Sequence, residues 1–363
     1  TDNESGINWI KIGDTSDSMY ITETAQKIIV EGMKKSRYVK PGDFLLSNSM
    51  SFGRPYILKI DGCIHDGWLV LRDENALFDK RFLYYYLSSK TTYKKLKSMA
   101  VGGVVNNLNS EMVRNVIVPV PDKEEQSEIA DLFDKIKKIL DDRKQELEQL
   151  DTLVKSRFVE MFGDIITGKY NYKIRKLGDV AFIGSSHRVF TTEFVESGIP
   201  FYRGTEIGEL ANGIEPSEPY YISEEHYNKL TKNNTKPRIG DLLMPSICNK
   251  GQIWMVDTDR PFYYKDGRVL CISPNRDIFN SKYLEYFMRI KTLVEYPKLG
   301  SGSTFAEFKI FLLKDMDVLV PPRNVQNQFA DFVASVDKSK SKIQKSLEET
   351  QLLFDSLMQK YFG

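Results

Sequence analysis

Residues 42–58 read GDFLLSNSMSFGRPYIL, and residues 240–256 read GDLLMPSICNKGQIWMV. Each stretch places Gly-Asp before three apolar residues, then a polar turn, a second Gly and an aromatic residue. The two stretches lie 198 residues apart and have the same length. A period this long indicates two large copies of one domain rather than a solenoid of short repeats.

The repeat continues in both directions along the chain. At an offset of 200, the matching pairs are Asp66-Gly67 with Asp266-Gly267, Val120-Pro121 with Val320-Pro321, Gln126 with Gln326, and Phe162-Gly163 with Phe362-Gly363. The chain has 363 residues, of which 41% are hydrophobic and 12% aromatic. This length and composition predict a globular protein with two or more domains.

Each copy begins with short apolar runs, such as residues 67–72 (GWLVLR) and 267–273 (GRVLCIS), which indicate strands. A short helix is predicted to follow over 80–98 and over 281–296. A hydrophobic strand that ends in proline is then predicted in each copy, NVIVPVP over 115–121 and MDVLVPP over 316–322. We therefore expect two diverged domains of the α/β (α+β) class.

The second part of each copy is a long stretch without internal Pro or Gly that predicts a long helix. Its residues repeat every seven positions, as in a coiled coil. The main rows are Phe133, Leu140, Leu147, Val154 and Met161 in copy 1, and Val333, Lys340, Leu347, Phe354 and Tyr361 in copy 2. We expect these helices to pair antiparallel within the chain as a spacer. The alternative is that each helix packs separately on its own domain.

The charges are unevenly distributed. The formal net charge is +1, but residues 122–164 carry −5 and residues 323–363 carry +1, which leaves +5 for the two globular segments. The three cysteines, Cys63, Cys248 and Cys271, fit no zinc spacing and suit a reducing compartment. No apolar run reaches 18 residues, so no membrane span is predicted, and a cytoplasmic location is expected.

This organisation indicates a reader with two heads. A helix of about 35–40 residues is roughly 50–60 Å long at about 1.5 Å per residue. B-DNA advances about 34–36 Å per turn, so this length matches one to two turns of duplex. Two diverged domains can recognise two different half-sites. A coiled-coil scaffold with two protein-binding adaptor heads and no DNA binding is the alternative.

Several paired stretches make the resemblance specific. They are the two opening stretches, VPVPDKEEQSEIADLFDKI (118–136) with VPPRNVQNQFADFVASV (320–336), VKSRFVEMFGD (154–164) with FDSLMQKYFG (354–363), and KLGDVAFIGSS (176–186) followed by GIPFYRGTEI (198–207). In this order they resemble the specificity subunit of type I restriction-modification systems, across nearly the whole chain.

The resemblance implies target-recognition domains over 1–118 and 165–319, and conserved helical regions over 119–164 and 320–363. It implies a non-catalytic subunit that binds double-stranded DNA, two methyltransferase subunits and restriction (translocase) subunits. Those partners would use S-adenosylmethionine, ATP and Mg²⁺, and this chain would use no cofactor and no metal. We find neither a GxxxxGK[ST] loop nor a Gly-rich dinucleotide loop.

The two copies open differently. Residues 172–198 precede IPFYRGTEI in copy 2, whereas only TDNESG precedes INWIKIGD in copy 1. The expectation is that the first recognition domain lacks its opening segment, either by truncation or because a strand comes from elsewhere. Self-association through this domain is one open alternative.

Base reading needs Arg for guanine and Asn or Gln for adenine, and phosphates accept hydrogen bonds from Lys, Ser and Thr. The aligned turns differ at nearly every polar position, as two readers of different sequences require, although ordinary turn chemistry also favours Ser, Asn and Gly. The candidate DNA-binding residues are Lys11, Asn48, Ser49, Ser51, Arg54, Asn106, Asn107, His187, Arg188, Arg203, Thr205, Ser246, Asn249, Lys250, Gln252, Ser301, Ser303 and Thr304.

Overall fold

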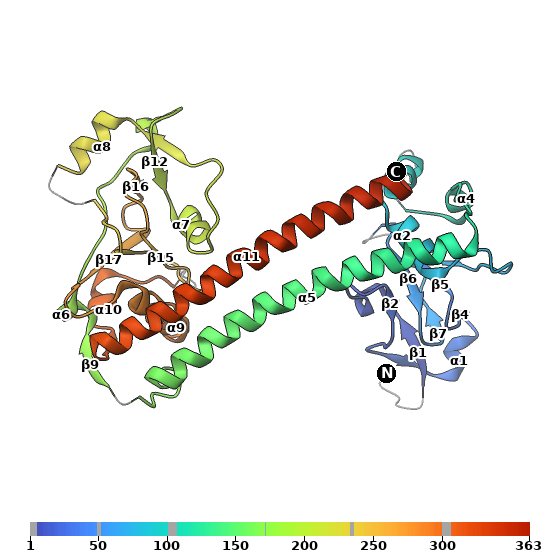
Figure 1. The fold of residues 1–363 in the computed structure, drawn as a ribbon, viewed down its shortest axis with the longest axis horizontal. Coiled ribbons are helices and arrows are strands. Elements are labelled where there is room, and N and C mark those ends of the chain that lie inside the picture. The colour runs from blue at the N-terminus through green and yellow to red at the C-terminus, as the bar shows by residue number, and fades with distance from the viewer. Residues whose placement is uncertain (1–5, 49–51, 101–106, 171, 233–235, 300–305) are drawn as a thin grey trace. The chain divides into compact units, whose positions relative to one another are not determined.

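The computed structural model describes residues 6–48, 52–100, 107–170, 172–232, 236–299 and 306–363. The chain divides into two compact units, which we call unit 1 (Thr1–Leu147 with Lys342–Gly363) and unit 2 (Glu148–Ser341). Two long helices, α5 (Lys123–Phe162) and α11 (Arg323–Phe362), contribute to both units (Figure 1).

Unit 1 contains two four-stranded sheets, with strand orders β3-β1-β7-β4 and β2-β6-β5-β8. The strands are β1 Ile7–Ile10, β2 Tyr20–Ile21, β3 Lys27–Ile28, β4 Arg37–Val39, β5 Phe44–Ser47, β6 Pro55–Leu58, β7 Gly62–Ile64 and β8 Trp68–Leu71. The short helices are η1 Ile12–Asp14, α1 Val30–Met33, α2 Lys80–Ser88, α3 Lys90–Ala100 and α4 Ser110–Arg114.

Unit 2 contains sheets of order β10-β17-β14-β15 and β11-β13-β12-β16, and a β18-β9 pair. The strands are β9 Lys173–Lys176, β10 Ala181–Gly184, β11 Phe194–Val195, β12 Ile199–Tyr202, β13 Tyr220–Ile222, β14 Leu242–Pro245, β15 Trp254–Met255, β16 Tyr263–Tyr264, β17 Val269–Pro274 and β18 Asp317–Val320. The short helices are α6 Leu177–Val180, η2 Thr191–Glu193, α7 Gly204–Leu210, α8 Glu224–Leu230, α9 Ser281–Glu295, η3 Tyr296–Leu299 and α10 Ile310–Lys314.

The two units share one topology, which confirms the repeat. In unit 1, β5 pairs antiparallel with β8 and β6, and in unit 2, β14 pairs antiparallel with β17 and β15. Strands β1 and β7 form a parallel pair, as do β12 and β16. The strands predicted over 67–72 and 267–273 are therefore central parts of this common frame.

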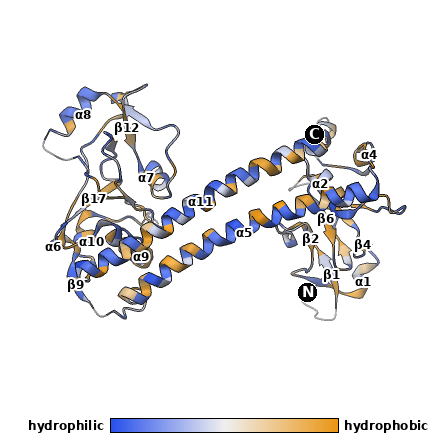
Figure 2. Ribbon diagram, in the orientation of Figure 1, coloured by the Kyte–Doolittle hydropathy of each residue, from blue (hydrophilic) through white to orange (hydrophobic). Residues whose placement is uncertain are grey.

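The long helices run antiparallel, as predicted. In unit 1, Phe133 near the start of α5 contacts Phe354 and Phe362 at the end of α11, with ring centroids 5.4 and 5.5 Å apart. In unit 2, Phe158 and Phe162 at the end of α5 contact Phe329 at the start of α11, at 5.3 and 5.4 Å. Figure 2 shows hydrophobic residues recurring along both helices.

The predicted seam is buried in part. Phe133, Leu140, Val154 and Val333 are buried, and Leu147, Leu347 and Phe354 are half-buried. Lys340 interrupts the apolar row, and its Nζ lies 2.7 Å from an Asp151 carboxylate oxygen. The fully buried Phe158 and Phe162 belong to neither predicted row. An α-helix has about 3.6 residues per turn, so its packed face drifts away from a strict seven-residue repeat.

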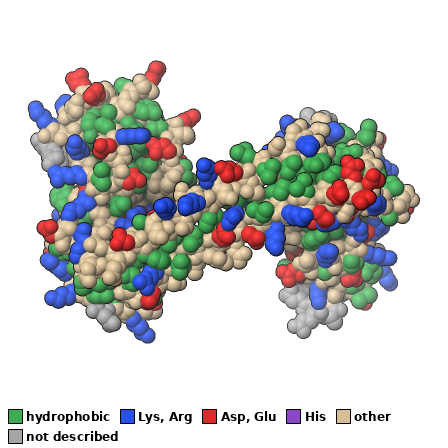
Figure 3. All heavy atoms as spheres, in the orientation of Figure 1, with side chains coloured by type: hydrophobic (Ala, Val, Ile, Leu, Met, Phe, Trp, Pro, Cys, Tyr) green, Lys and Arg blue, Asp and Glu red, His purple; other side chains and the backbone are tan. Residues whose placement is uncertain are grey.

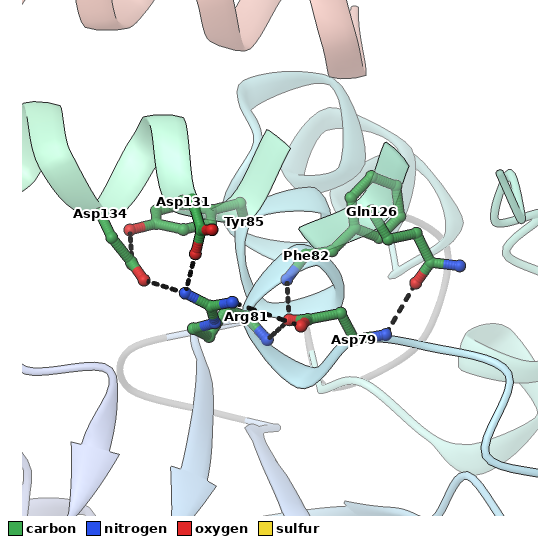
Figure 4. Close-up of polar contacts among 7 residues, drawn as sticks. All are labelled: Asp79, Arg81, Phe82, Tyr85, Gln126, Asp131 and Asp134. Atoms are coloured by element: carbon green, nitrogen blue, oxygen red, sulfur yellow. Dashed lines mark hydrogen bonds and ion pairs between the residues drawn. The ribbon is translucent and has the colours of Figure 1, made fainter. Parts of the chain in front are cut away.

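A repeated glutamine joins each globular part to its long helix. In unit 1, Oε1 of Gln126 accepts a hydrogen bond from the backbone N–H of Asp79, 2.7 Å away, and Asp79 caps α2 (Figure 4). Unit 2 repeats this contact between Gln326 and Asn280, at 2.9 Å. Arg81 adds ion pairs in unit 1 to Asp131 and Asp134 of α5, at 2.6 and 2.7 Å. The match at offset 200 therefore marks a docking contact.

Two predicted elements of copy 1 are wrong. Residues 80–98 form two helices, because Ser89 is extended (ψ 146°) and its Oγ accepts a hydrogen bond from the N–H of Thr92 at the start of α3. Residues 115–121 form no strand, whereas their counterpart β18 pairs with β9. A strand needs a neighbour to satisfy its backbone groups, and in the part of the chain that the structure describes, 115–121 has none.

Within the described residues, no helix is both long and apolar enough to cross a lipid bilayer.

Candidate nucleic-acid interface

The duplicated Gly-Asp forms a structural turn in both units. Gly42 and Gly240 have positive φ angles of 90° and 83°, which glycine adopts easily. The following carboxylates, of Asp43 and Asp241, accept backbone hydrogen bonds of 3.0 and 2.8 Å from Lys40 and Arg238.

Each of these carboxylates also forms an ion pair, Asp43 with Arg72 at 2.9 Å and Asp241 with Arg276 at 2.7 Å. Burial alone would raise the pKa of Asp43, but the hydrogen bond from Arg72 helps to hold that pKa below its ordinary value. The shared letters therefore build the turn, and the variable letters that follow are free to serve recognition.

The variable turn in unit 1 is held by its neighbours. Asn48 donates from its side chain to the carbonyl oxygen of Asp66, at 2.8 Å. The guanidinium of Arg54 donates to the carbonyl oxygen of Ser16 and to the carboxylate of Asp17, both at 3.0 Å. The side chains of Arg54 and Asp17 are 41% and 99% exposed, so this ion pair is weak and open to competition by a ligand.

Unit 2 gathers four of the predicted residues around one pocket of about 380–640 Å³ scale, with a volume of 640 Å³. Its walls contain the predicted Arg203, Thr205, Ser246 and Gln252, and also Gly204, Pro245, Ile247, Lys265 and Arg268. Arg203 and Thr205 come from the start of α7, and Ser246 and Gln252 come from the variable turn. Helix α7 packs beside β14, so the fold brings these two segments together.

The pocket carries cations whose positions are fixed. Arg203 forms an ion pair with the buried Glu206, and its guanidinium lies 4.6 Å from the centroid of the Tyr220 ring. Arg268 lies 2.9 Å from a carboxylate oxygen of Glu307. Burial alone would raise the pKa of Glu206, but the Arg203 hydrogen bond contributes to a pKa below the ordinary value. Fixed guanidinium groups are suited to planar acceptors such as phosphate or a base edge.

Other predicted residues lie around this pocket or point elsewhere. Arg188 forms an ion pair with Asp266 at 3.2 Å, which ties it to the Lys265–Arg268 turn. His187 is exposed, and its backbone N–H donates to the Tyr263 hydroxyl. Asn249 and Lys250 are exposed and are not among the pocket-lining residues. Ser246 is buried, with its Oγ directed at Glu307.

The segment before the last part of each copy lies against the variable turn. The N–H of Leu108 donates to the carbonyl oxygen of Asn48 at 3.0 Å, and the N–H of Phe308 donates to that of Ser246 at 2.7 Å. Asn107 is exposed beside this contact. In unit 1, Lys11 lies apart from it, and its Nζ is 3.0 Å from Oε1 of Gln26. The predicted residues Ser49, Ser51, Asn106, Ser301, Ser303 and Thr304 lie outside the described residues.

Sequence reasoning missed Lys265 and Arg268. Both flank Asp266-Gly267, which was recognised only as a match to Asp66-Gly67. The available signal was the change of flanking residues, because copy 2 places cations where copy 1 has His65 and Trp68. Figure 3 shows Lys and Arg side chains interspersed with Asp and Glu on the visible face, so no surface of a single charge marks the site.

Comparison with known proteins gives consistent relatives. The model of the family "Type I restriction modification DNA specificity domain" matches residues 1–150 and 169–350. The chain is 22% identical to the specificity subunit of type I restriction enzyme MjaIX of Methanocaldococcus jannaschii, over 98% of this chain and 85% of that protein. It is 23% identical to the MjaVIII specificity subunit of the same organism, over 90% and 81%.

Solved structures show the same fold. One, described as the structural basis of complex assembly and conformational transition of the type I R-M system, has a TM-score of 0.65 at 17% identity and covers 99% of this chain and 91% of that one. The S subunit of a type I system from M. genitalium has a TM-score of 0.56 at 15% identity, over 99% and 93%.

Proposed function

Because the chain belongs to the family of type I restriction modification DNA specificity domains, we propose that it is a specificity subunit that reads DNA for a type I restriction-modification system. The observation that carries this proposal is a single structural frame, present twice, with different polar side chains in its variable turns. Ser51, Phe52 and Arg54 in copy 1 correspond to Asn249, Lys250 and Gln252 in copy 2. Two different readers in one chain would recognise a split target with two unlike half-sites.

In this proposal, the pocket of unit 2 divides its work between two kinds of contact. Lys265 and Arg268 bind phosphate oxygens, which sets the register of the unit on the duplex without reading sequence. Gln252 reads a base edge, for which its amide is suited to adenine. Arg203, which Glu206 and Tyr220 hold in place, lies at the wall between the two.

The helices α5 and α11 are the proposed platform for partner subunits. The chain would hold two methyltransferase subunits and, in the complete assembly, restriction subunits that translocate DNA. These partners would supply the chemistry with S-adenosylmethionine, ATP and Mg²⁺, and the methyltransferases would flip their target base out of the duplex. The role of this chain is to place them at the half-sites.

A salt titration tests DNA binding directly. The full chain, together with its methyltransferase partner, is titrated into a labelled duplex while KCl is varied, and binding is followed by fluorescence anisotropy. Because bound cations release counterions from DNA, the logarithm of affinity should fall linearly with the logarithm of salt, with a slope of about −0.9 per phosphate contact. The double variant Lys265→Ala with Arg268→Ala should flatten this slope by about 1–2.

The matched control is Lys345→Ala, which removes a cation whose side chain is 78% exposed on α11. The slope of the control should equal that of the unaltered chain. A chain that binds its methyltransferase partner but no duplex at low salt would be a protein scaffold, which would contradict the proposal.

A further inference from the structure

One segment of unit 2 closes a gap between two sheets. Residues Lys173–Gly184 contain β9, α6 and β10, where β9 pairs antiparallel with β18 and β10 pairs antiparallel with β17. Between these strands, Leu177, Val180 and Ile183 are 0%, 1% and 2% exposed and lie in the main apolar core of the unit. The segment therefore satisfies two strand edges and fills the apolar space between them.

The counterparts of both edges are open in unit 1. Strand β8, the counterpart of β17, lies at the edge of its sheet, where β5 is its one partner among the described strands. Residues 115–121, the counterpart of β18, pair with no described strand. Ile117 is 85% exposed and Val120 is 52% exposed, and Val118 is half-buried, whereas its counterpart Val318 is 1% exposed.

An apolar pocket of 380 Å³ lies between these two edges. Seven of its lining residues are Phe44, Leu71, Leu83, Leu87, Val113, Val116 and Val118. Their counterparts in unit 2 are Leu242, Ile272, Leu284, Met288, Leu313, Met316 and Val318, all of which are buried in the same cluster as Leu177, Val180 and Ile183. The pocket of unit 1 thus occupies the place that those three side chains fill in unit 2.

The backbone of 116–120 is suited to receive a strand. In unit 2, the N–H of Leu177 donates to the carbonyl oxygen of Met316, at 2.9 Å, and Val318 lies opposite Arg175. Hydrogen-bonded positions alternate along an antiparallel pair, so the backbone of Leu319 points away from β9. Its counterpart is Pro119, which lacks an N–H but would lose no hydrogen bond to an incoming strand.

The inward-facing carbonyls agree with this alternation. In unit 2, the Tyr283 hydroxyl donates to the carbonyl oxygen of Leu319, at 3.1 Å. In unit 1, the Tyr86 hydroxyl donates to that of Ile117, at 2.6 Å. Residues 117 and 119 therefore face the body of the unit, and the N–H and C=O groups of Val118 face outward, where the counterpart Val318 meets β9.

We propose that unit 1 is an acceptor for a strand–turn–strand segment of the pattern found in Lys173–Gly184. Its first strand pairs with residues 116–120, its apolar side chains enter the pocket, and its second strand pairs with the outer edge of β8. This inference rests on the comparison of the two units and is independent of DNA reading.

One position of the incoming segment should differ from the pattern of unit 2. Lys176 forms ion pairs there with Asp315 and Asp317, at 3.2 and 3.0 Å. The counterparts of these two aspartates are Asn115 and Ile117, which carry no charge. An apolar, β-branched residue opposite Ile117 should therefore bind better than Lys.

The test uses a labelled synthetic peptide of residues 172–185 that carries Lys176→Val, with binding to the 363-residue chain followed by fluorescence anisotropy. We expect saturable binding at one peptide per chain, at least tenfold tighter than that of the peptide with Lys176 retained. A peptide that also carries Leu177→Asp and Val180→Asp should not bind. In the protein, Val118→Asp should weaken binding at least tenfold, and Ile214→Asp, at an exposed site in unit 2, should leave it unchanged.

Hydrogen exchange gives a readout that does not depend on the stability of the variants. On adding the peptide to the unaltered chain, the amides of Val118 and Val120 and those of β8 should become protected. Absence of binding, or binding that neither Val118→Asp nor amide protection registers, would overturn the proposal. A dimer of this chain that the peptide does not dissociate would also overturn it, because a second copy would then cover the groove.

Discussion

At the scale of single residues, the duplicated letters and the variable letters have separate roles. Asp43 and Asp241 hold equivalent turns through Arg72 and Arg276. These contacts explain why Gly-Asp occurs twice, and they leave the following residues free to differ. Side chains such as Gln252 could be proposed from the sequence because residue type limits what can read a base. The ion pair of Arg203 with Glu206 could not, since it depends on how deeply the carboxylate is buried.

Gln252→Ala should change sequence preference more than affinity for random DNA. Loss of one base contact costs about 1–3 kcal/mol at a single position of the target, which is about a 5- to 150-fold loss of discrimination there. Lys265→Ala should instead weaken binding to all duplexes about equally, as expected for a phosphate contact. Affinities measured for a duplex panel with each position of one half-site varied distinguish the two. Equal losses on every duplex for Gln252→Ala would contradict the assignment.

Glu206→Gln should lower the stability of unit 2 in a pH-dependent way. The folded-state pKa of Glu206 lies below its ordinary value, so its charge stabilises the fold above about pH 4.3, and this contribution is lost as pH falls through the folded-state pKa. The side chain of Arg203 is 39% exposed, so we expect a loss of only about 1 kcal/mol at pH 7 and less at pH 3.5. Urea unfolding at both pH values measures it.

The control for this change is Glu225→Gln, which alters an exposed carboxylate in the first turn of α8. It should change the free energy of unfolding by less than about 0.5 kcal/mol. An equal effect of Glu206→Gln at pH 7 and pH 3.5 would contradict a role for the carboxylate charge.

At the scale of elements, periodicity predicted the helices well and their packing less well. The seven-residue rows located α5, α11 and their antiparallel pairing, because Phe133 and Val154 recur at a spacing that only a helix brings onto one face. The rows missed Phe158, since the packed face drifts along a straight helix. Residues 115–121 have the composition of a strand, but a strand also depends on a neighbour that local sequence does not specify.

Phe133→Ala should destabilise the packing of α5 against α11 strongly. Its ring is fully buried and contacts Phe354 and Phe362, and removal of a buried Phe costs about 3–5 kcal/mol. Leu352→Ala, at a position of α11 that is 70% exposed, is the matched control and should cost less than about 0.5 kcal/mol. Thermal and urea unfolding of both variants check this. Equal stability of the two would show that Phe133 is not part of the core.

At the scale of the whole molecule, the exchange of helix ends links the two copies. Phe362, from copy 2, packs against Phe82 of unit 1, and Phe162, from copy 1, packs against Tyr283 of unit 2. Each unit is therefore completed by a helix end from the other copy. The sequence revealed the repeat, but its symmetry alone left open which helix would complete which unit, because both helices end in the same Phe-Gly.

The central claim is that one chain carries two different DNA readers, and selection from a random duplex library tests it most directly. The full chain, purified with its methyltransferase partner, selects bound duplexes, and the enriched pool is sequenced. The proposed function predicts two short unlike sequences separated by a gap of fixed length and unread sequence. A pool without any enriched sequence, recovered from a complex that is intact, would contradict it.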